Sequence, residues 1–285
     1  MNPPTTTDPS TTSNNPSSPT AREMALSITD RPYLSWSQVS SYQSCPRAYA
    51  FRYVDQAEPE FTPSSLCFGG AIHSAISLHH EARLEGADPP THEQLMSLIR
   101  YDLEPVAAPI RFNKDEDRDS LLSLAERLIQ AYLASDLANP EGEILCIEES
   151  VRASLDDDLP DLNGIVDLVT RVEQGLIVTD FKTTRSAWND QKAEENAGQL
   201  RLYGELVRRQ LEDAPVHALQ FLTITKAKSP KVQLHVISAS DEKLNATLDQ
   251  VREVWRGIEA GVFPPRPGWT CRTCPFQSQC DSAAV

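Results

Sequence analysis

Two aspartates and one lysine interrupt otherwise apolar segments of this chain, and together they could bind a divalent cation. Asp167 lies in one run rich in Val, Ile and Leu, and Asp180 and Lys182 lie in the next. A buried carboxylate is costly unless it is paired or binds a metal. Two hard oxygen ligands suit Mg²⁺ or Mn²⁺, and the lysine could orient or help to deprotonate an attacking water. These residue types indicate metal-assisted hydrolysis, although an Asp-x-Lys at an exposed strand end is also a common surface pair.

The segment that must position these residues, 163–182, has the pattern of a β-hairpin. Two apolar runs flank a tight turn at 173–175, which Gly175 closes. Asp180 and Lys182 are two residues apart, so a strand directs both side chains to one face. The pattern leaves the register open, because a slip by one residue would place Asp167 and Asp180 on opposite faces.

Three other candidates for this site lie outside the hairpin. His73 stands near a predicted helix start, where a lone His is usually structural. Glu148 or Glu149 could reach the metal from a neighbouring strand, although a solvated strand end is the simpler interpretation. Gln199 and Tyr203 share a helical face, as many residues four apart do.

Cysteines near the C-terminus indicate a second metal site. Cys271, Cys274 and Cys280 follow one another with x2 and x5 spacing. In a chain that is not a disulfide scaffold, clustered thiols favour metal binding.

Such a site normally has four ligands, and the C-terminal segment offers no fourth Cys or His. Cys45 is the best candidate for the fourth ligand because it stands in an irregular junction before Pro46. Cys67 and Cys146 lie beside apolar runs and fit buried, inert thiols.

Composition limits the function classes. The 285 residues include 26 Lys and Arg against 41 Asp and Glu, for a formal net charge of -15. This balance argues against a protein that binds DNA by general electrostatic attraction, but it allows a nuclease whose metals and local basic groups contact phosphates. The chain has no long apolar run and no signal-peptide pattern, so we expect a cytoplasmic protein with no membrane partner.

The chain divides into a tail and one domain. Residues 1–30 form a Ser/Thr/Pro-rich tail that we expect to be disordered because it offers little apolar surface to bury, and 31–285 form the domain. Helical and strand patterns alternate along the domain, with a helical stretch over 83–139. We expect helices at 35–42, 47–54, 71–85, 92–103, 120–137, 190–211 and 241–260, and strands at 144–151, 163–182, 217–226 and 232–238.

Six short motifs occur in one order along 34–280, and together they resemble the RecB-like branch of the PD-(D/E)XK nuclease superfamily. The likeness is to its iron–sulfur members, the CRISPR-associated RecB-like exonucleases and the AddB-type repair nucleases. Each motif is weak alone, but six in order make chance implausible. The motifs are Ser-x-Tyr-x-x-Cys-Pro at 40–46, Gly-x-x-x-His at 69–73, Gly-x-x-Asp at 164–167, Asp-x-Lys at 180–182, Gln-x-x-x-Tyr at 199–203 and the cysteine triplet.

The resemblance implies an α/β fold: a restriction-endonuclease-like mixed central sheet flanked by helices, with a helical layer and a C-terminal Cys cluster. It implies that His73, Asp167 and Asp180 bind Mg²⁺ or Mn²⁺, with the backbone carbonyl of Phe181 assisting. Lys182 would position and polarise the water.

The same resemblance assigns the remaining motifs. Gln199 and Tyr203 would support the site or hold the DNA backbone. A 4Fe–4S cluster is the implied occupant of the thiolate site, with a structural Zn²⁺ as the alternative. Its ligands would be Cys45, Cys271, Cys274 and Cys280.

Three functions are compatible with the sequence. The first is a metal-dependent DNA nuclease, an exonuclease on single strands or DNA ends, in DNA processing, repair or CRISPR adaptation. The second is a non-catalytic DNA-end or partner-binding module, which the charge of -15 favours, with a helicase or CRISPR adaptation proteins as partners. The third is a structural metal protein in which the Asp-x-Lys is incidental.

Overall fold

A mixed six-stranded sheet forms the centre of the computed structural model, which describes residues 19–105, 108–212 and 214–280. The strand order is β1-β5-β6-β7-β8, and β4 pairs with β5. The β1–β5 and β6–β7 pairs are parallel and the other pairs are antiparallel. The sheet confirms the predicted α/β class. Its strands are β1 (Tyr33–Ser35), β4 (Glu143–Ala153), β5 (Asp161–Val172), β6 (Gly175–Thr184), β7 (Val216–Thr225) and β8 (Val232–Ile237).

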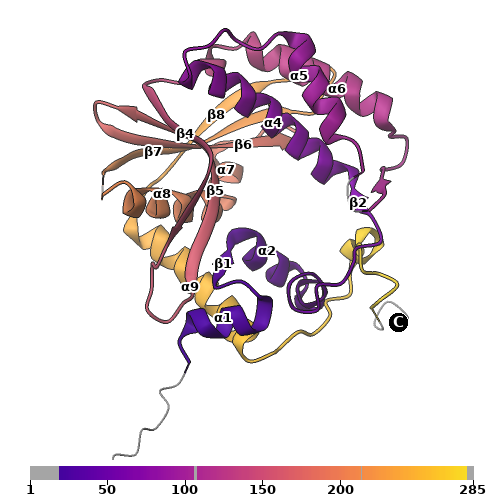
Figure 1. The fold of residues 1–285 in the computed structure, drawn as a ribbon, viewed down its shortest axis with the longest axis vertical. Coiled ribbons are helices and arrows are strands. Elements are labelled where there is room, and N and C mark those ends of the chain that lie inside the picture. The colour runs from indigo at the N-terminus through magenta and orange to yellow at the C-terminus, as the bar shows by residue number, and fades with distance from the viewer. Residues whose placement is uncertain (1–18, 106–107, 213, 281–285) are drawn as a thin grey trace, which may run out of the picture.

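Helices cover both faces of this sheet (Figure 1). Successive residues of a strand point to opposite faces, so Phe221 belongs to one hydrophobic core and Leu222 to the other. The core around Leu222 contains α4 (Ser64–Leu84), α5 (His92–Asp102) and α6 (Arg118–Leu133), and it forms the predicted helical layer. The core around Phe221 contains α1 (Ala21–Thr29), α2 (Trp36–Ser44), α8 (Gly198–Gln210) and α9 (Asp241–Glu259).

The sheet register determines where the predicted site residues meet. β5 and β6 pair from Val172–Gly175 as far as Leu168–Thr179, and there the pairing ends. Farther along the same edge of β5, residues 161–163 pair with β1 instead. Figure 1 shows β5 turning away from β6 towards β1. The sheet therefore contains a fork, and the residues after the last β5–β6 pair lie at its base.

Two predicted helices have different bounds in the structure. α4 begins at Ser64, before the Gly69-Gly70 pair that the sequence places ahead of the helix. Burial of Phe68 and Ile72 on the same helix outweighs the low helix propensity of glycine. The helix predicted at 190–211 is two helices, α7 (Asp190–Glu195) and α8. At Gly198 a Cβ would lie 2.4 Å from the Trp36 ring, so this close contact fixes where α8 begins.

The predicted tail at 1–30 is too long. Residues 21–29 form α1, with a capping box between Thr20 and Glu23 and with Ala25 and Thr29 buried. The capping interactions and one buried face explain why this short polar segment is helical. Residues 1–18 lie outside the described residues. Among the helices of the described ranges, none is long and apolar enough to cross a membrane.

His80 on α4 makes stability depend on pH. The side chain is fully buried, its Nε2 lies 2.7 Å from the Tyr132 hydroxyl, and its ring stacks on Phe181. Burial lowers the pKa of His80 to about 4, below its ordinary 6.5. Protonation therefore favours the unfolded chain, and this stability is complete above pH 6.5 and is lost as the pH falls towards 4. We expect a loss on the order of 3 kcal/mol across this range.

Denaturant unfolding at several pH values tests this prediction. The His80→Phe variant keeps a planar ring but cannot titrate, so its unfolding free energy is expected to fall less steeply between pH 6.5 and 4. Equal slopes for the two proteins would contradict it.

Candidate active site

Asp167 and Asp180 lie together at the base of the fork between β5 and β6. Each is adjacent to the last β5–β6 pair, Leu168–Thr179. Asp167 Oδ2 accepts a hydrogen bond from the backbone N–H of Phe181, at 2.6 Å. This bond occupies a donor that strand pairing no longer uses. The structure thus provides the register that the sequence left open, and it brings the two carboxylates together.

His73 reaches the same place from α4. Its Nδ1 lies 3.4 Å from Asp167 Oδ2 and 4.0 Å from Glu148 Oε1. Burial lowers the pKa of His73, but the Asp167 carboxylate beside it outweighs burial and leaves that pKa above its ordinary value. His73, Glu148 and Asp167 each offer a ligand atom, and these atoms lie within 4.8 Å of one another. An imidazole nitrogen and two carboxylates form a donor set suited to a divalent metal.

Glu148 belongs to this group, although its side chain is 35 % exposed. Its Oε1 accepts a hydrogen bond from Ser77 Oγ at 3.1 Å, and burial raises the pKa of the carboxyl. Its φ of 49° lies in the left-handed region, which costs a non-glycine residue conformational energy. Glu149, the alternative, does not join the group that the described residues form. The acidic pair after an apolar strand was the only signal for this position in the sequence.

Asp180 lies outside the group of three and contacts Lys182 instead. The side chain is 2 % exposed, and its Oδ2 lies 2.6 Å from the Lys182 ammonium, without hydrogen-bond geometry. Burial raises the pKa of Asp180 to about 6, and the lysine opposes this rise. A buried carboxylate oxygen that accepts no hydrogen bond is suited to a cation.

A polar relay continues from Lys182 along α8. The lysine donates to Gln199 Oε1 at 3.1 Å, and Gln199 Nε2 donates to the Tyr203 hydroxyl at 2.9 Å. Tyr203 is 7 % exposed, and burial raises its pKa to about 12, so it remains a neutral phenol. Gln199 thus contacts Lys182 directly, and Tyr203 contacts it through Gln199. These two hydrogen bonds orient the lysine.

Gly164 has a packing role that explains its place in the Gly-x-x-Asp motif. A Cβ at this position would lie 2.3 Å from Cε1 of the Tyr203 ring. We predict that Gly164→Ala displaces this ring, lowers the unfolding free energy by about 1–3 kcal/mol and weakens the lysine relay. Thermal unfolding measures the first effect. Gly70→Ala is the matched control, because a Cβ there meets nothing within 4 Å. Equal losses in the two variants would contradict this role.

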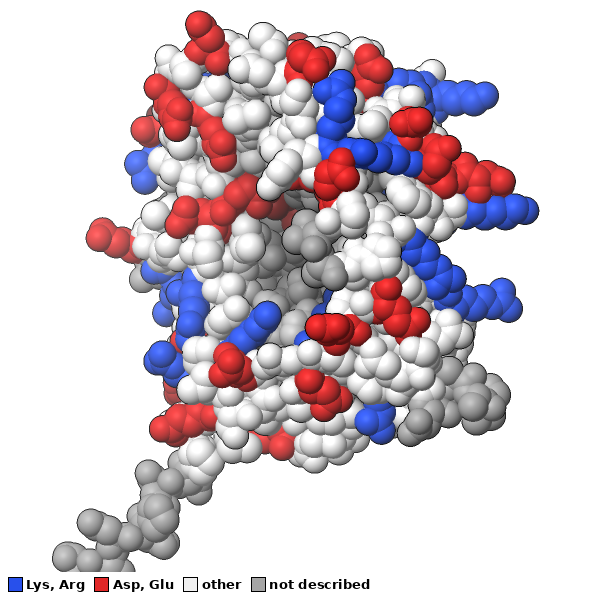
Figure 2. Space-filling model, turned by 45° about the vertical axis from the view of Figure 1, so that its right-hand side comes forward, with Lys and Arg blue, Asp and Glu red and all other residues white. Residues whose placement is uncertain are grey.

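The site opens into a cleft of about 850 Å³. His73, Glu148 and Lys182 line it, and α4 contributes a wall of small side chains. Figure 2 shows a hollow on one face of the molecule, with acidic side chains along its upper border and both acidic and basic ones below it.

The four cysteines predicted to form a thiolate site line one small cavity of about 30 Å³. Cys45, at the junction of α2 and α3 (Pro46–Tyr49), thus lies beside residues more than 220 positions away in the chain. Cys67 and Cys146 do not line this cavity, and burial raises the pKa of both thiols. Two arginines, Arg47 and Arg266, line the cavity as well.

Comparison with known proteins gives one family. The sequence model described as "PD-(D/E)XK nuclease superfamily" matches residues 33–281. No curated protein matches the chain. Among solved structures, a candidate exonuclease from Eubacterium rectale has a TM-score of 0.55 and 14% identity, over 85% of this chain and 86% of that one. The structure of SSO0001 has a TM-score of 0.37 and 15% identity, over 86% of this chain and 93% of that one.

Proposed function

Because the chain belongs to the PD-(D/E)XK nuclease superfamily, we propose that it is a metal-dependent deoxyribonuclease of the RecB-like branch. Its substrate would be DNA, cleaved as an exonuclease from single strands or ends. The observation that carries this proposal is the convergence of His73, Glu148 and Asp167 at one fork in the sheet, beside Asp180 and Lys182.

The residues fit a bound Mg²⁺ or Mn²⁺. By their spacing we assign His73, Glu148 and Asp167 as ligands. Asp180 Oδ2, which also contacts the Lys182 ammonium, and the Phe181 carbonyl are the further oxygens that we assign to the ion. When bound, such an ion lowers the pKa of a coordinated water and stabilises the departing oxygen of a phosphodiester.

The chain's own residues then orient the reactants. Lys182 is held between Asp180 and Gln199, so its ammonium has a defined place from which to position the attacking water and to offset charge on the phosphate. Tyr203 fixes the Gln199 amide by accepting its N–H, and this leaves the amide oxygen to the lysine.

We assign a 4Fe–4S cluster to the thiolate cavity. Cys45, Cys271, Cys274 and Cys280 line one cavity, so the four thiols could bind one group. The x2 and x5 spacing of the last three cysteines resembles that of the iron–sulfur members of the family, and for this reason we favour the cluster over a structural Zn²⁺.

Cleavage of labelled single- and double-stranded DNA tests the proposed activity. Degradation with Mn²⁺ or Mg²⁺, and none in EDTA, is the expected result. A protein of verified metal content that leaves every substrate intact would contradict the proposal.

The second candidate is a non-catalytic module that binds DNA ends or a helicase or CRISPR adaptation partner. The net charge of -15 favours it over a free nuclease. The convergence of the donor set and Lys182 at the fork favours the nuclease. Binding of DNA ends without metal-dependent turnover would decide for the module.

A further inference from the structure

A second cavity, of about 370 Å³, lies outside the cleft. Arg31, which follows α1, and Arg52, in the π-helix η1 (Ala50–Val54), both line it. The Arg31 guanidinium lies over the Tyr53 ring, 5.6 Å from its centroid, and that of Arg52 lies over Phe276, at 5.9 Å. Such contacts restrict the guanidinium planes and leave their N–H groups for a further partner.

The backbone around this cavity has an unusual conformation. Asp30 and Gln56 line it with φ of 56° and 49°, in the left-handed region. Non-glycine residues adopt this region uncommonly, and π-helical turns such as η1 are frequent at functional sites. The fold thus presents the two arginines from strained segments rather than from regular helix surfaces.

Neither Arg31 nor Arg52 forms an ion pair within 19–105, 108–212 and 214–280, although Asp30 lines the same cavity. Within these ranges, two guanidiniums therefore line one cavity without a carboxylate that offsets their charge. An anion with several acceptor oxygens is the ligand that two such forks fit best.

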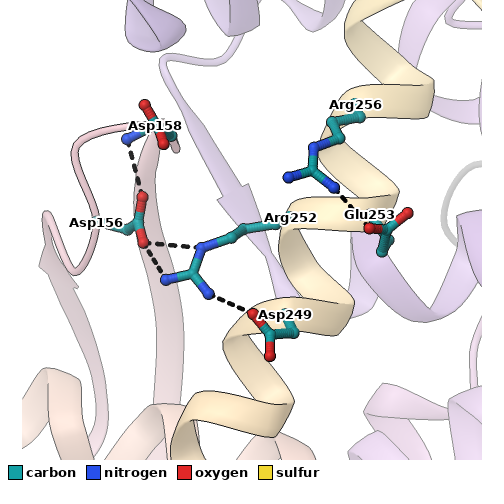
Figure 3. Close-up of polar contacts among 6 residues, drawn as sticks. All are labelled: Asp156, Asp158, Asp249, Arg252, Glu253 and Arg256. Carbon is teal, nitrogen blue, oxygen red and sulfur yellow. Dashed lines mark hydrogen bonds and ion pairs between the residues drawn. The ribbon is translucent and has the colours of Figure 1, made fainter.

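Several arginines elsewhere in the molecule are held in ion pairs. On α9, Arg252 pairs with Asp156 and Asp249, and Arg256 pairs with Glu253 (Figure 3). These arginines join α9 to the loop after β4 and to its own turns, whereas Arg31 and Arg52 contact aromatic rings.

The cavity and the cleft lie at the two ends of a short connection. Pro59 lines the cavity and Ser65 lines the cleft. Six residues span at most about 20 Å, which is about six nucleotides at the 3.4 Å spacing of a helical strand. A DNA strand of about this length is therefore long enough to span from Ser65 to Pro59.

We propose that the cavity of Arg31 and Arg52 binds phosphate ester groups of the DNA strand about six nucleotides from the cleavage site. This inference rests on the proposed nuclease function. The same phosphate chemistry could come from a released mononucleotide, so the test includes both sources.

The test compares Arg31→Gln/Arg52→Gln with a control that loses the same charge, Arg127→Gln/Arg171→Gln, at exposed positions outside both cavities. Binding of labelled oligothymidylate of about 20 nucleotides is measured in EDTA, so that nothing is cleaved. We expect at least about tenfold weaker binding for the cavity variant and a salt slope smaller by about 1.4, for two lost contacts. A labelled tetranucleotide is expected to bind both variants alike because it is too short to reach the cavity.

The outcomes separate this inference from the function on which it rests. Equal binding of the long oligonucleotide and of dTMP by both variants overturns the inference, whereas metal-dependent cleavage by wild type would still stand. If the cavity variant loses binding of dTMP but not of the oligonucleotide, the cavity is a phosphate site whose ligand is a released mononucleotide. Arg52→Lys, which keeps the charge but loses the planar fork, provides an intermediate loss if the double variant is unstable.

Discussion

Asp180→Asn is expected to lower metal-dependent DNA cleavage by at least about a thousandfold without lowering the stability of the metal-free protein. The activity loss would follow from removing an anionic oxygen from the proposed metal site and leaving Lys182 without its carboxylate partner, which together would cost about 4 kcal/mol of transition-state stabilisation. Cleavage rates on labelled DNA with saturating Mn²⁺ measure it.

The same substitution is expected to raise the unfolding free energy, whereas substitution of a residue that stabilises the fold would lower it. Burial raises the pKa of Asp180 to about 6, so the folded state binds its proton more tightly than the unfolded state does. The carboxyl therefore stabilises the fold fully below its unfolded pKa of 3.8, and this contribution is lost as the pH rises through 6. At pH 8 the neutral amide is expected to add up to about 3 kcal/mol.

Denaturant unfolding in EDTA at pH 8 measures this effect. Asp157→Asn makes the same change in an exposed turn and is expected to alter neither cleavage nor stability. An Asp180→Asn protein that cleaves within tenfold of wild type would remove Asp180 from the reaction. A large loss of stability would assign the residue to the fold instead.

Local patterns predicted the strands of the hairpin but not the site that they form. The two apolar runs and the turn that Gly175 closes are properties of a few neighbouring residues. They predict a hairpin, and β5 and β6 form it. The fork depends on β1, more than 120 residues earlier in the chain, which replaces β6 along the edge of β5. No local pattern encodes that replacement, so the proximity of Asp167 and Asp180 had to come from the structure.

Glu148 shows a second limit of sequence reasoning. Glu148 lies between the Ile147–Leu168 and Glu149–Val166 pairs, so the β4–β5 register places it opposite Asp167. A local pattern cannot predict which residues of two strands lie opposite each other. His73 was found only because Gly-x-x-x-His resembles a family motif, since its helix position alone is unremarkable. The residues that form the donor set thus come from three elements whose contacts are all long-range.

The second large effect is expected at the thiolate cavity. Cys45→Ser is predicted to abolish cluster or metal retention and to lower the unfolding free energy by about 5 kcal/mol. The reason is loop closure: the proposed bound group would join Cys45 to the C-terminal thiols, and cross-links that close loops of this length constrain the unfolded chain by that amount.

Two observations make this test specific. The matched control, Cys67→Ser, changes a thiol that lies outside the cavity, so it is expected to keep the metal content of wild type. Metal and sulfide analysis, with visible absorption, identifies the occupant, and thermal unfolding measures the loss.

Because Glu60 on the connection to α4 accepts hydrogen bonds from Ser278 N–H and Oγ, release of the C-terminal segment is also expected to loosen the wall of the cleft. A Cys45→Ser protein that unfolds at the wild-type temperature would show that the thiols do not close the chain.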